Sequence, residues 1–330
     1  MFTLYHGNRL ELLADQLIEQ LQQHRPADAF SPQQVLVPSN GMARWLRLRI
    51  ARQRGICAQI DFPLPAVFTW DTYCQVLHQH SLPRRSLYTP ALLVWQLLEL
   101  FEQPVGEDAR DLPLRHYLAG ADEARRYQLA ARIADCFDQY LVYRPYWIQR
   151  WEQGEDHPQQ PWQSRLWRRL YARRDPQLSP ATHRVRLADA FAQQLHSGPL
   201  SVELHRPLFV FGVGSLAPPY ITLLKQLSER GVAVHFFLLS PCQEYWADIR
   251  SERWLAKREV QGDDLVELHW DVGNPLLASL GQQGREFQAQ LWHTINPEQD
   301  VALYHTPSSA SLLGQIQADL LELRPRSDEG

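Results

Sequence analysis

The stretch Phe2-Thr3-Leu4-Tyr5-His6, continued by the turn Gly7-Asn8-Arg9 and the segment Leu10–Gln23, decides the fold of this chain. Its spacing of apolar residues predicts a strand, a tight turn and an amphipathic helix in that order. The same frame underlies the P-loop, in which helix N-terminal amides and a glycine-rich turn hold phosphate groups. A working P-loop also needs a lysine followed by Ser or Thr. Because Lys225 and Lys257 are the only lysines and neither follows a glycine loop, we expect no ATP hydrolysis by this route.

Composition bounds the class of protein. A chain of 330 residues with 45% hydrophobic residues can bury a sizeable core in one or two domains. Cys57, Cys74, Cys136 and Cys242 lie far apart without CxxC pairing, which favours a reducing compartment over a disulfide scaffold or a zinc ribbon. The first residues show no basic region followed by an apolar run, and no stretch approaches the roughly 18–20 apolar residues that span a membrane. We therefore expect a cytoplasmic protein without a membrane segment.

The positive charge of the chain is carried almost entirely by arginine. The net charge is -4, and 31 of the 33 basic residues are arginines. Arginine offers bidentate phosphate contacts and a flat stacking surface that lysine lacks. A GC-rich gene would give the same bias without functional meaning, so both explanations stay open. The eleven tryptophans are either stacking platforms for bases or core residues.

Alternating patterns predict an open, mostly parallel α/β sheet. Short apolar runs bounded by Gly, Pro or Ser predict buried strands at Gln34–Ser39, Asp61–Leu64, Leu208–Val213 and Val232–Leu239. Helical periodicity separates them at Gly41–Arg54, Thr69–His78 and Pro218–Arg230. Further along, we predict a Trp-rich loop after Leu239, a helix near Leu276–His293, a strand at Val301–His305 and a helix at Ser308–Leu323.

Residues 80–204 show helical periodicity only. The predicted helices are Thr89–Phe101, Leu112–Leu118, Glu123–Tyr140, Pro161–Arg174 and Ala181–Leu195. We interpret this stretch as a helical insertion between two halves of one α/β domain, which comprises residues 1–79 and 205–323. The tail 324–330 has the composition of a truncated interdomain linker.

Five stretches of the sequence are distinctive, namely Phe2–Leu10, Val35–Leu46, Ile60–Pro65, Phe137–Pro145 and Asp271–Ser279. Together they resemble RecC, the gamma subunit of exodeoxyribonuclease V (the RecBCD helicase–nuclease). The resemblance runs in order from residue 1 to about residue 325. Because members of the family are about three times longer, it implies an N-terminal fragment.

The resemblance implies a domain like the first motor domain of superfamily 1 helicases, with its ATP machinery lost. Phe211 stands near the position where active relatives carry a magnesium-binding acid, and an aromatic ring cannot ligate a hard cation. A nuclease site of the type fused to these complexes needs Glu two residues before Lys, but Leu223 and Leu255 occupy those positions. We therefore expect no ATPase or nuclease site and no cofactor in this chain, with ATP and Mg²⁺ on RecB-like and RecD-like partner subunits.

The segment Gly41–Arg54 is the clearest candidate for a DNA contact. It carries Arg44, Arg47, Arg49, Arg52 and Arg54 together with Trp45. Cations for phosphates and a ring for stacking suit a surface that follows a DNA strand. The alternative is a solvated basic face with Trp45 in the core. The resemblance favours the first interpretation, because this helix lies beside the single-strand channel in the family.

By resemblance, eleven positions map to reading of the Chi sequence on the 3′-ended strand. They are Pro38, Asn40, Arg44, Leu64, Trp70, Asp135, Cys136, Asp138, Gln139, Arg144 and Arg184. Familiar members carry Gln, Thr and Gln at the first three positions and Leu at the position of Cys136. Proline has no side-chain donor and arginine cannot accept, so hydrogen-bond readout must differ here. Phosphate contacts, which carry affinity without sequence information, could persist.

Other functional classes fit the sequence less well. Asp135 and Asp138 share a helix face, yet acids at this spacing usually form an exposed polar surface rather than a catalytic pair. Cys74, His78 and His80 lack the fourth ligand of a structural zinc site. We predict a non-catalytic subunit that guides the 3′-ended strand in double-strand break repair and binds single- and double-stranded DNA. A scaffold domain without DNA contact is the alternative.

Overall fold

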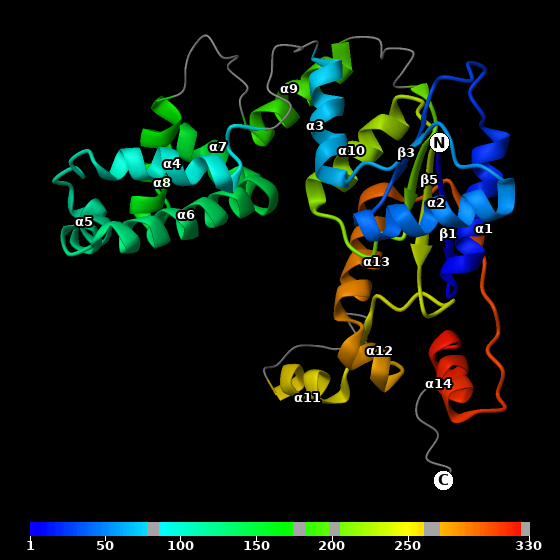
Figure 1. Ribbon diagram of the computed structural model, residues 1–330. Coiled ribbons are helices and arrows are strands. Elements are labelled where there is room, and N and C mark those ends of the chain that lie inside the picture. Colours follow the sequence, from blue (N-terminus) through cyan, green and yellow to red (C-terminus); the bar gives the residue numbers. More distant parts are fainter. Residues whose placement is uncertain (78–85, 174–182, 198–204, 261–270, 325–330) are drawn as a thin grey trace. The chain divides into compact units, whose positions relative to one another are not determined.

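The computed structural model describes residues 1–77, 86–173, 183–197, 205–260 and 271–324. Contacts between residues divide the chain into two units (Figure 1). The sheet unit comprises Met1–Phe68, Ser201–Leu216 and Tyr220–Gly330, and the helical unit comprises Thr69–Leu200 and Ala217–Pro219. Each is described by itself. The predicted domain boundaries stay a prediction, because a division by contacts does not test independent folding.

A six-stranded parallel sheet forms the centre of the sheet unit, in the order β3-β2-β4-β5-β1-β8. Its strands are β1 (Phe2–Gly7), β2 (Gln33–Leu36), β3 (Ile60–Asp61), β4 (Leu208–Phe211), β5 (Val234–Leu239) and β8 (Gln299–Ala302). The prediction of an α/β fold with a parallel sheet is confirmed. A separate parallel pair joins β6 (Ile249–Arg250) to β7 (Asp271–Val272).

Helices cover both faces of this sheet, as apolar strand runs without alternation require. On one face, Phe209, Phe211 and Phe237 form a core with α1 (Leu10–Gln23) and α2 (Asn40–Arg54). The opposite face carries Phe236, whose ring lies 6.1 Å from that of Phe287 in α13. The remaining helices of this unit are α10 (Pro218–Glu229), α11 (Glu252–Val260), α12 (Pro275–Leu280), α13 (Gln282–Ile295) and α14 (Leu312–Leu321).

The helical unit is built around aromatic side chains. Its buried core includes Leu97, Phe137, Trp151 and Trp167. The elements are α3 (Pro65–Val76, whose first four residues belong to the sheet unit), α4 (Pro90–Phe101), a 3-10 turn at Ala109–Asp111, α5 (Leu112–Ala119), α6 (Glu123–Tyr143), α7 (Pro145–Glu152), α8 (Pro161–Ala172) and α9 (Arg184–Ser197). Most tryptophans here are thus core residues, which is one of the two alternatives that the composition left open.

Several predicted elements are wrong in extent. The helix predicted near 276–293 is two helices, because a Cβ at Gly281 would lie 2.4 Å from the Leu277 carbonyl oxygen. Pro65 begins α3 four residues before the predicted start, since proline suits the first turn of a helix. The last strand pairs with β1 over Gln299–Ala302 rather than lying at 301–305. The helix predicted at 308–323 is shorter, because the Ser311 side chain caps α14 by accepting from the Gly314 N–H.

Helices α7 and α11 and strands β6 and β7 were not predicted, and some predictions fall outside the described residues. Helix α7 follows α6 after one residue, and the stretch predicted as a Trp-rich loop holds β6 and α11. The ends predicted at His78, Arg174 and Ala181 lie outside the described residues, as does most of the predicted linker tail. None of the helices in the described ranges is both long and apolar enough to cross a membrane.

Candidate nucleic-acid interface

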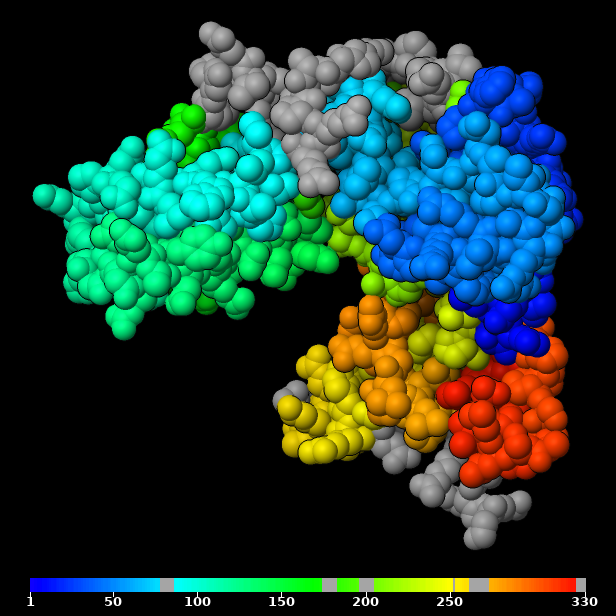
Figure 2. All heavy atoms as spheres, in the orientation of Figure 1, coloured from blue at the N-terminus to red at the C-terminus, as the bar shows by residue number. Residues whose placement is uncertain are grey.

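Helix α2 is fixed at both ends and along one side. The Ser39 hydroxyl accepts a hydrogen bond from the Met42 N–H, which caps the N-terminus. Gly55 ends the helix in the left-handed region at φ 77°, where glycine avoids strain. Ala43, Leu46 and Ile50 are buried against the core. The remaining side of α2 therefore lies at the surface, on the face shown in Figure 2.

This surface carries guanidinium groups without carboxylate partners. Arg44, Arg47 and Arg52 are exposed and Arg54 is half-buried, and α2 itself contains no acidic residue. In the described parts of the chain, only Arg49 of this helix forms an ion pair, with the Asp15 carboxylate at 2.7 Å. Unpaired guanidinium groups on one helix attract phosphate through charge and bidentate geometry.

The half-buried ring of Trp45 packs against the core. It stacks on Phe211 with ring centroids 6.2 Å apart, and the Arg49 guanidinium lies 5.8 Å from its centre. This packing favours the alternative that Trp45 is a core residue, and stacking of its ring on DNA bases stays a prediction. Among the described residues, Arg47 is the one unpaired arginine of α2 with an aromatic contact, and its guanidinium lies 5.0 Å from the centre of the Phe62 ring.

Four of the predicted Chi positions lie at the carboxyl edge of the sheet. Pro38 is exposed between β2 and α2, Asn40 is the exposed first residue of α2, and Arg44 follows within the first turns of the helix. Leu64 follows β3, and its carbonyl accepts from the Phe68 N–H at the start of α3. Because neighbouring parallel strands end at the same edge, these four positions share one region, where α/β proteins commonly bind ligands.

The other predicted positions belong to the helical unit. In α6, Asp135 and Gln139 are exposed, whereas Cys136 and Asp138 are half-buried. Asp138 Oδ1 lies 3.4 Å from Arg184 Nη2, so the structure brings these two predicted residues together. Burial raises the pKa of Asp138, the neighbouring charge of Asp135 adds to the rise, and Arg184 opposes it.

Arg144 stands where α6 gives way to α7. Its guanidinium lies 5.8 Å over the Trp147 ring, and Nη1 donates to the Tyr143 carbonyl. Tyr143 and Tyr146 beside it are about half exposed. Neither tyrosine was predicted as a site residue, and α7 was not predicted; the proline after Arg144 was the available signal for a new helix start.

Trp70 differs from the other positions of this set. It is 9% exposed, so its ring is packed within the protein. The eleven positions thus form two groups, one in each unit: the first four lie together in the sheet unit, and the remainder occupy α3, α6, the α6–α7 junction and α9 in the helical unit.

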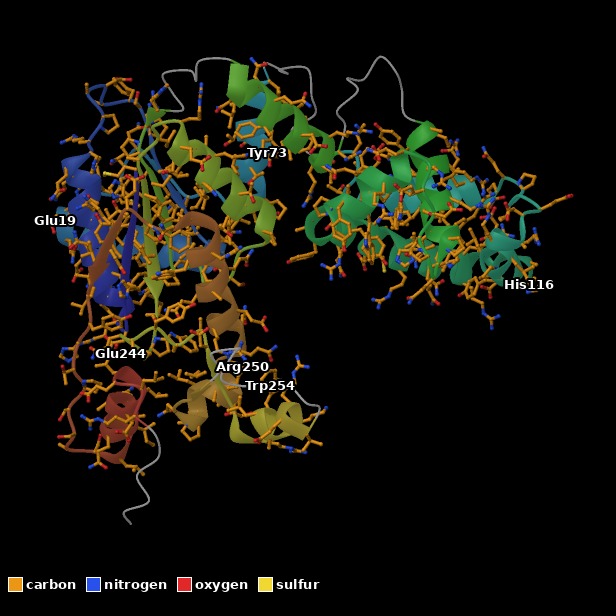
Figure 3. All side chains as sticks on the ribbon, turned by 180° about the vertical axis from the view of Figure 1, so that it is seen from behind. Glu19, Tyr73, His116, Glu244, Arg250 and Trp254 are labelled. Carbon is orange, nitrogen blue, oxygen red and sulfur yellow. The ribbon has the colours of Figure 1, made fainter. Side chains whose placement is uncertain are left out.

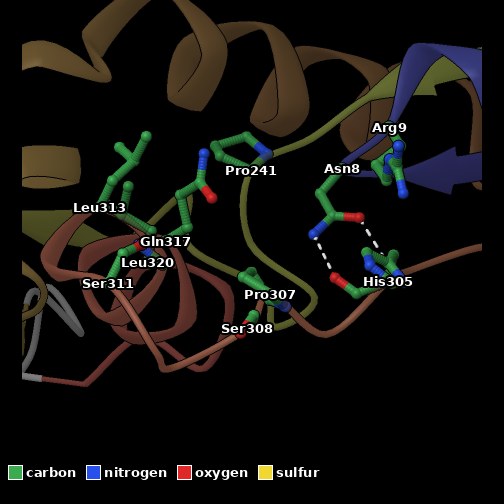
Figure 4. Close-up of a pocket in the computed structure, with 11 residues that line it drawn as sticks. Asn8, Arg9, Pro241, His305, Pro307, Ser308, Ser311, Leu313, Gln317 and Leu320 are labelled. Carbon is green, nitrogen blue, oxygen red and sulfur yellow. Dashed lines mark hydrogen bonds between the residues drawn. The ribbon is translucent and has the colours of Figure 1, made fainter.

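The turn after β1, where a P-loop would hold phosphate, is closed by the chain itself. The Leu303 N–H donates to the His6 carbonyl at 2.7 Å, and a Cβ at Gly7 would lie 2.3 Å from the Leu303 carbonyl oxygen. The Asn8 amide both donates to and accepts from the His305 backbone, at 2.8 and 2.9 Å (Figure 4). This backbone segment is pressed against the turn that would have to cradle a nucleotide.

A pocket of about 560 Å³ opens beside that turn. Its lining includes Asn8, Arg9, His305, Ser311 and Gln317 (Figure 4), and among the described residues neither a lysine nor a carboxylate contributes to it. It therefore lacks the lysine and the acidic residue that help to bind a nucleotide–magnesium complex in a P-loop.

At the end of β4, a buried aromatic residue stands near the position where a magnesium-binding acid was considered. Phe211 is fully buried, and its ring lies 6.0 Å from that of Phe237. Within the described ranges, no group of three or more His, Cys, Asp or Glu side chains could hold a metal ion. His78 and His80, considered with Cys74 as a chance cluster, lie outside those ranges.

The sequence of this chain is similar to that of a known protein family over almost its whole length. The sequence profile described as the N-terminal domain of RecC matches residues 2–323. The chain belongs to the RecC family. The RecBCD enzyme subunit RecC of Escherichia coli K12 is 34% identical over 357 aligned residues, which cover 100% of this chain and 31% of that protein.

Other family members show similar sequence identity and coverage. The RecC subunit of Haemophilus influenzae is 34% identical over 98% of this chain and 33% of its own length. That of Mycolicibacterium smegmatis is 30% identical over 96% of this chain and 28% of its own length. The chain therefore spans about a third of the curated relatives that it matches, in agreement with the N-terminal fragment inferred from the sequence.

Proposed function

We propose that this chain is the non-catalytic, DNA-contacting N-terminal part of a RecC-type subunit, and that it guides a separated single strand. The observation that carries this proposal is the surface of α2, where Arg44, Arg47, Arg52 and Arg54 have no ion-pair partner among the described residues. Arg44 lies near the carboxyl edge of the parallel sheet, and the other three arginines follow along α2. Cations spaced along one helix suit the phosphates of a strand that passes over it.

The proposed chemistry is binding. Superfamily 1 motor ancestry accounts for the β1–turn–α1 frame, and a turn closed by Leu303 and His305 accounts for the loss of nucleotide binding. In this proposal, ATP and Mg²⁺ act on RecB-like and RecD-like partner subunits, because the relatives are described as subunits of the RecBCD enzyme. The assembled complex would act in the cytoplasm on broken double-stranded DNA.

Reading of a Chi-like sequence forms the finer part of the proposal. Asp135 and Gln139 are exposed and carry acceptor and amide groups suited to base edges. Pro38 and Arg44 replace residues that could both donate and accept. The sequence that is read should therefore differ from the familiar Chi octamer, while strand affinity is retained through phosphate contacts.

A salt titration of strand binding tests the proposal. Fluorescence anisotropy with a labelled single-stranded oligonucleotide should show affinity whose logarithm falls by about 0.7 per phosphate contact for each tenfold rise in salt. Replacing Arg44 and Arg47 with Ala should remove two contacts and lower that slope by about 1.4. A matched variant that replaces Arg25 and Arg253, exposed arginines elsewhere in the sheet unit, should keep the slope of the native chain.

The same experiment distinguishes the scaffold alternative. If the Arg44 and Arg47 variant binds the strand with unchanged affinity and slope, α2 is not a DNA contact. Scaffolding would then be favoured, and the exposed pair Trp95 and Tyr127, with ring centroids 6.3 Å apart on α4 and α6, would be the surface to test for a protein partner.

A further inference from the structure

A small pocket lies in the helical unit, and none of the eleven predicted Chi positions lines it. It has a volume of about 280 Å³ and is formed by α7 and the loop that follows. Figure 3 shows the side chains of this unit as sticks, with His116 of α5 labelled. The aromatic and charged residues of the lining are Trp147, Arg150, Trp151, Glu155, Asp156 and His157.

Three aromatic rings form the wall of this pocket. Trp147 and Trp151 are four residues apart on α7 and therefore lie on one side of the helix, with ring centroids 6.1 Å apart. Gly154 ends the helical turn in the left-handed region at φ 101°, where glycine avoids strain. The loop then brings back His157, whose ring meets that of Trp147 edge to face at a centroid distance of 4.7 Å.

The charged groups of the lining are already compensated. Glu155 Oε2 accepts a hydrogen bond from Arg150 Nε at 2.6 Å. The Asp156 carboxylate pairs with Arg110 at 2.7 Å and also with Arg168. An ion that entered the pocket would have to compete with one of these pairs, so electrostatic complementarity favours a neutral ligand.

Three N–H donors of the lining have no acceptor among the described residues. His157 Nδ1 accepts from the Gln159 and Gln160 N–H groups, at 3.3 and 3.1 Å, so its ring proton is on Nε2. Neither this N–H nor the indole N–H of Trp147 or Trp151 donates to a described residue. Trp151 is only 2% exposed, yet its indole nitrogen is not among the sealed polar atoms without a partner. Its N–H therefore stays accessible at the pocket that this residue lines.

We propose that this pocket binds a single nucleobase. Aromatic walls offer stacking and edge contacts to a flat ring, and the N–H donors suit the carbonyl oxygens of a base such as thymine. The volume lies just below the roughly 300–1,000 Å³ of sites for drug-sized ligands, which suits one base. The His157 N–H donates to Ser164 Oγ of α8 at 3.1 Å, so the loop is already fixed before binding. The base comes either from a DNA strand, a source that rests on the strand binding proposed above, or from a free nucleoside.

Comparison of (dT)12 with an abasic strand of the same length tests the pocket, because both strands carry the same phosphates. Fluorescence anisotropy of the native chain should show an affinity for (dT)12 that is higher by about tenfold. His157→Asn keeps an acceptor for the loop N–H groups but loses the ring, and Trp147→Phe loses an indole N–H, so both should bring the ratio of affinities toward one. Trp162→Phe is the matched control, because Trp162 is also partly buried against this core, but its N–H donates to Gln160 and it does not line the pocket.

Saturation-transfer NMR with free thymidine distinguishes the two sources. A preference for (dT)12 that Trp147→Phe removes and Trp162→Phe retains identifies a DNA strand as the source of the base. Transfer to thymidine that His157→Asn removes, without such a preference, identifies a free nucleoside. The absence of both results overturns the base pocket. The salt slope of the abasic strand tests the phosphate contacts of α2 separately, so the base pocket and the proposed strand binding can fail independently.

Discussion

Arginines have opposite surroundings in the two units. In the helical unit, most of the described arginines form ion pairs with acids. Asp138 pairs with Arg184, Glu102 with Arg126, Asp111 with Arg165 and Glu152 with Arg186, and further pairs involve Arg110, Arg150, Arg168 and Arg173. On α2 of the sheet unit, Arg49 is the one arginine that forms an ion pair with another described residue. The same residue type therefore stabilises the protein in one unit and is available to a ligand in the other.

The comparison shows why the number of arginines could not identify a DNA surface. A compositional bias towards arginine supplies the same side chain everywhere, but only the neighbours decide whether its charge is already neutralised. Helix α2 has no acid of its own, and Asp15 of α1 reaches only Arg49.

Glu152 should be the most costly acid to replace. Its side chain is 1% exposed, and it contacts His183 Nε2 at 2.8 Å, Arg186 Nε at 2.7 Å and Trp167 Nε1 at 3.2 Å. Glu152→Gln leaves a cation next to a buried neutral amide and should lower the free energy of unfolding by about 3 kcal/mol. Urea denaturation measures this loss.

A matched acid three residues along provides the control. Glu155 pairs with Arg150 at the surface, so Glu155→Gln should change the free energy of unfolding by less than about 1 kcal/mol. Equal losses in the two variants would show that burial does not decide how much an ion pair of the helical unit contributes to the free energy of unfolding. Neutralisation by acids would then not explain the role of the arginines in this unit.

His235 tests the opposite situation, a buried base without an acid. It is 2% exposed, Tyr5 Oη lies 3.4 Å from Nδ1, and Nε2 has no hydrogen-bond partner among the described residues. Burial, with the nearby His24 and the N-terminus, lowers the pKa of His235 from 6.5 to about 4. As the pH falls from 6.5 to 4, His235 is protonated in the unfolded chain but stays neutral in the folded chain.

The free energy of unfolding of the native chain should therefore fall by roughly 3 kcal/mol between pH 6.5 and 4, with no further loss from this group at lower pH. His235→Phe, which fits between the neighbouring rings of Phe209 and Tyr5, should remove this part of the pH dependence. Urea titrations of both proteins at a series of pH values measure it. The same slope in the variant and in the native chain would assign the loss to other groups.

Arg49 and Arg52 should separate stability from binding within α2. Arg49→Ala removes a half-exposed ion pair with Asp15 and should cost up to about 1 kcal/mol of stability, with little effect on strand affinity. Arg52→Ala removes an exposed, unpaired cation and should leave the melting temperature unchanged while it lowers the salt slope by about 0.7. Thermal melting and anisotropy measured on both variants check the pair; the reverse assignment would contradict the proposed interface.

Much of the fold followed from local pattern. Helix α1 is at the predicted residues, Leu10–Gln23, because an amphipathic face and a preceding glycine turn are local signals. The predicted ends of helices and strands were wrong where they depend on contacts with residues from other elements. Gly281 breaks a helix because of its closeness to Trp246 and to the Leu277 carbonyl, and β8 ends at Ala302 because its register is set by pairing with β1.

The candidate site was less predictable than the fold. The basic helix was visible from the sequence, and so was its lack of acids. The packing of Trp45 could not be predicted from the sequence, because its ring packs on Phe211, a residue far away in the chain. The meeting of Asp138 with Arg184 likewise joins segments that no spacing relates.

The sequence by itself determined the parallel α/β frame, the absence of a P-loop lysine and the membership of the RecC family, because each depends on residue type and order along the chain. Only the tertiary structure decided which arginines are neutralised, that Leu303 and His305 close the turn after β1, and that three aromatic rings of α7 and its following loop line one pocket. The physical reason is that charge compensation and burial depend on distances in space, and side chains from different elements set those distances.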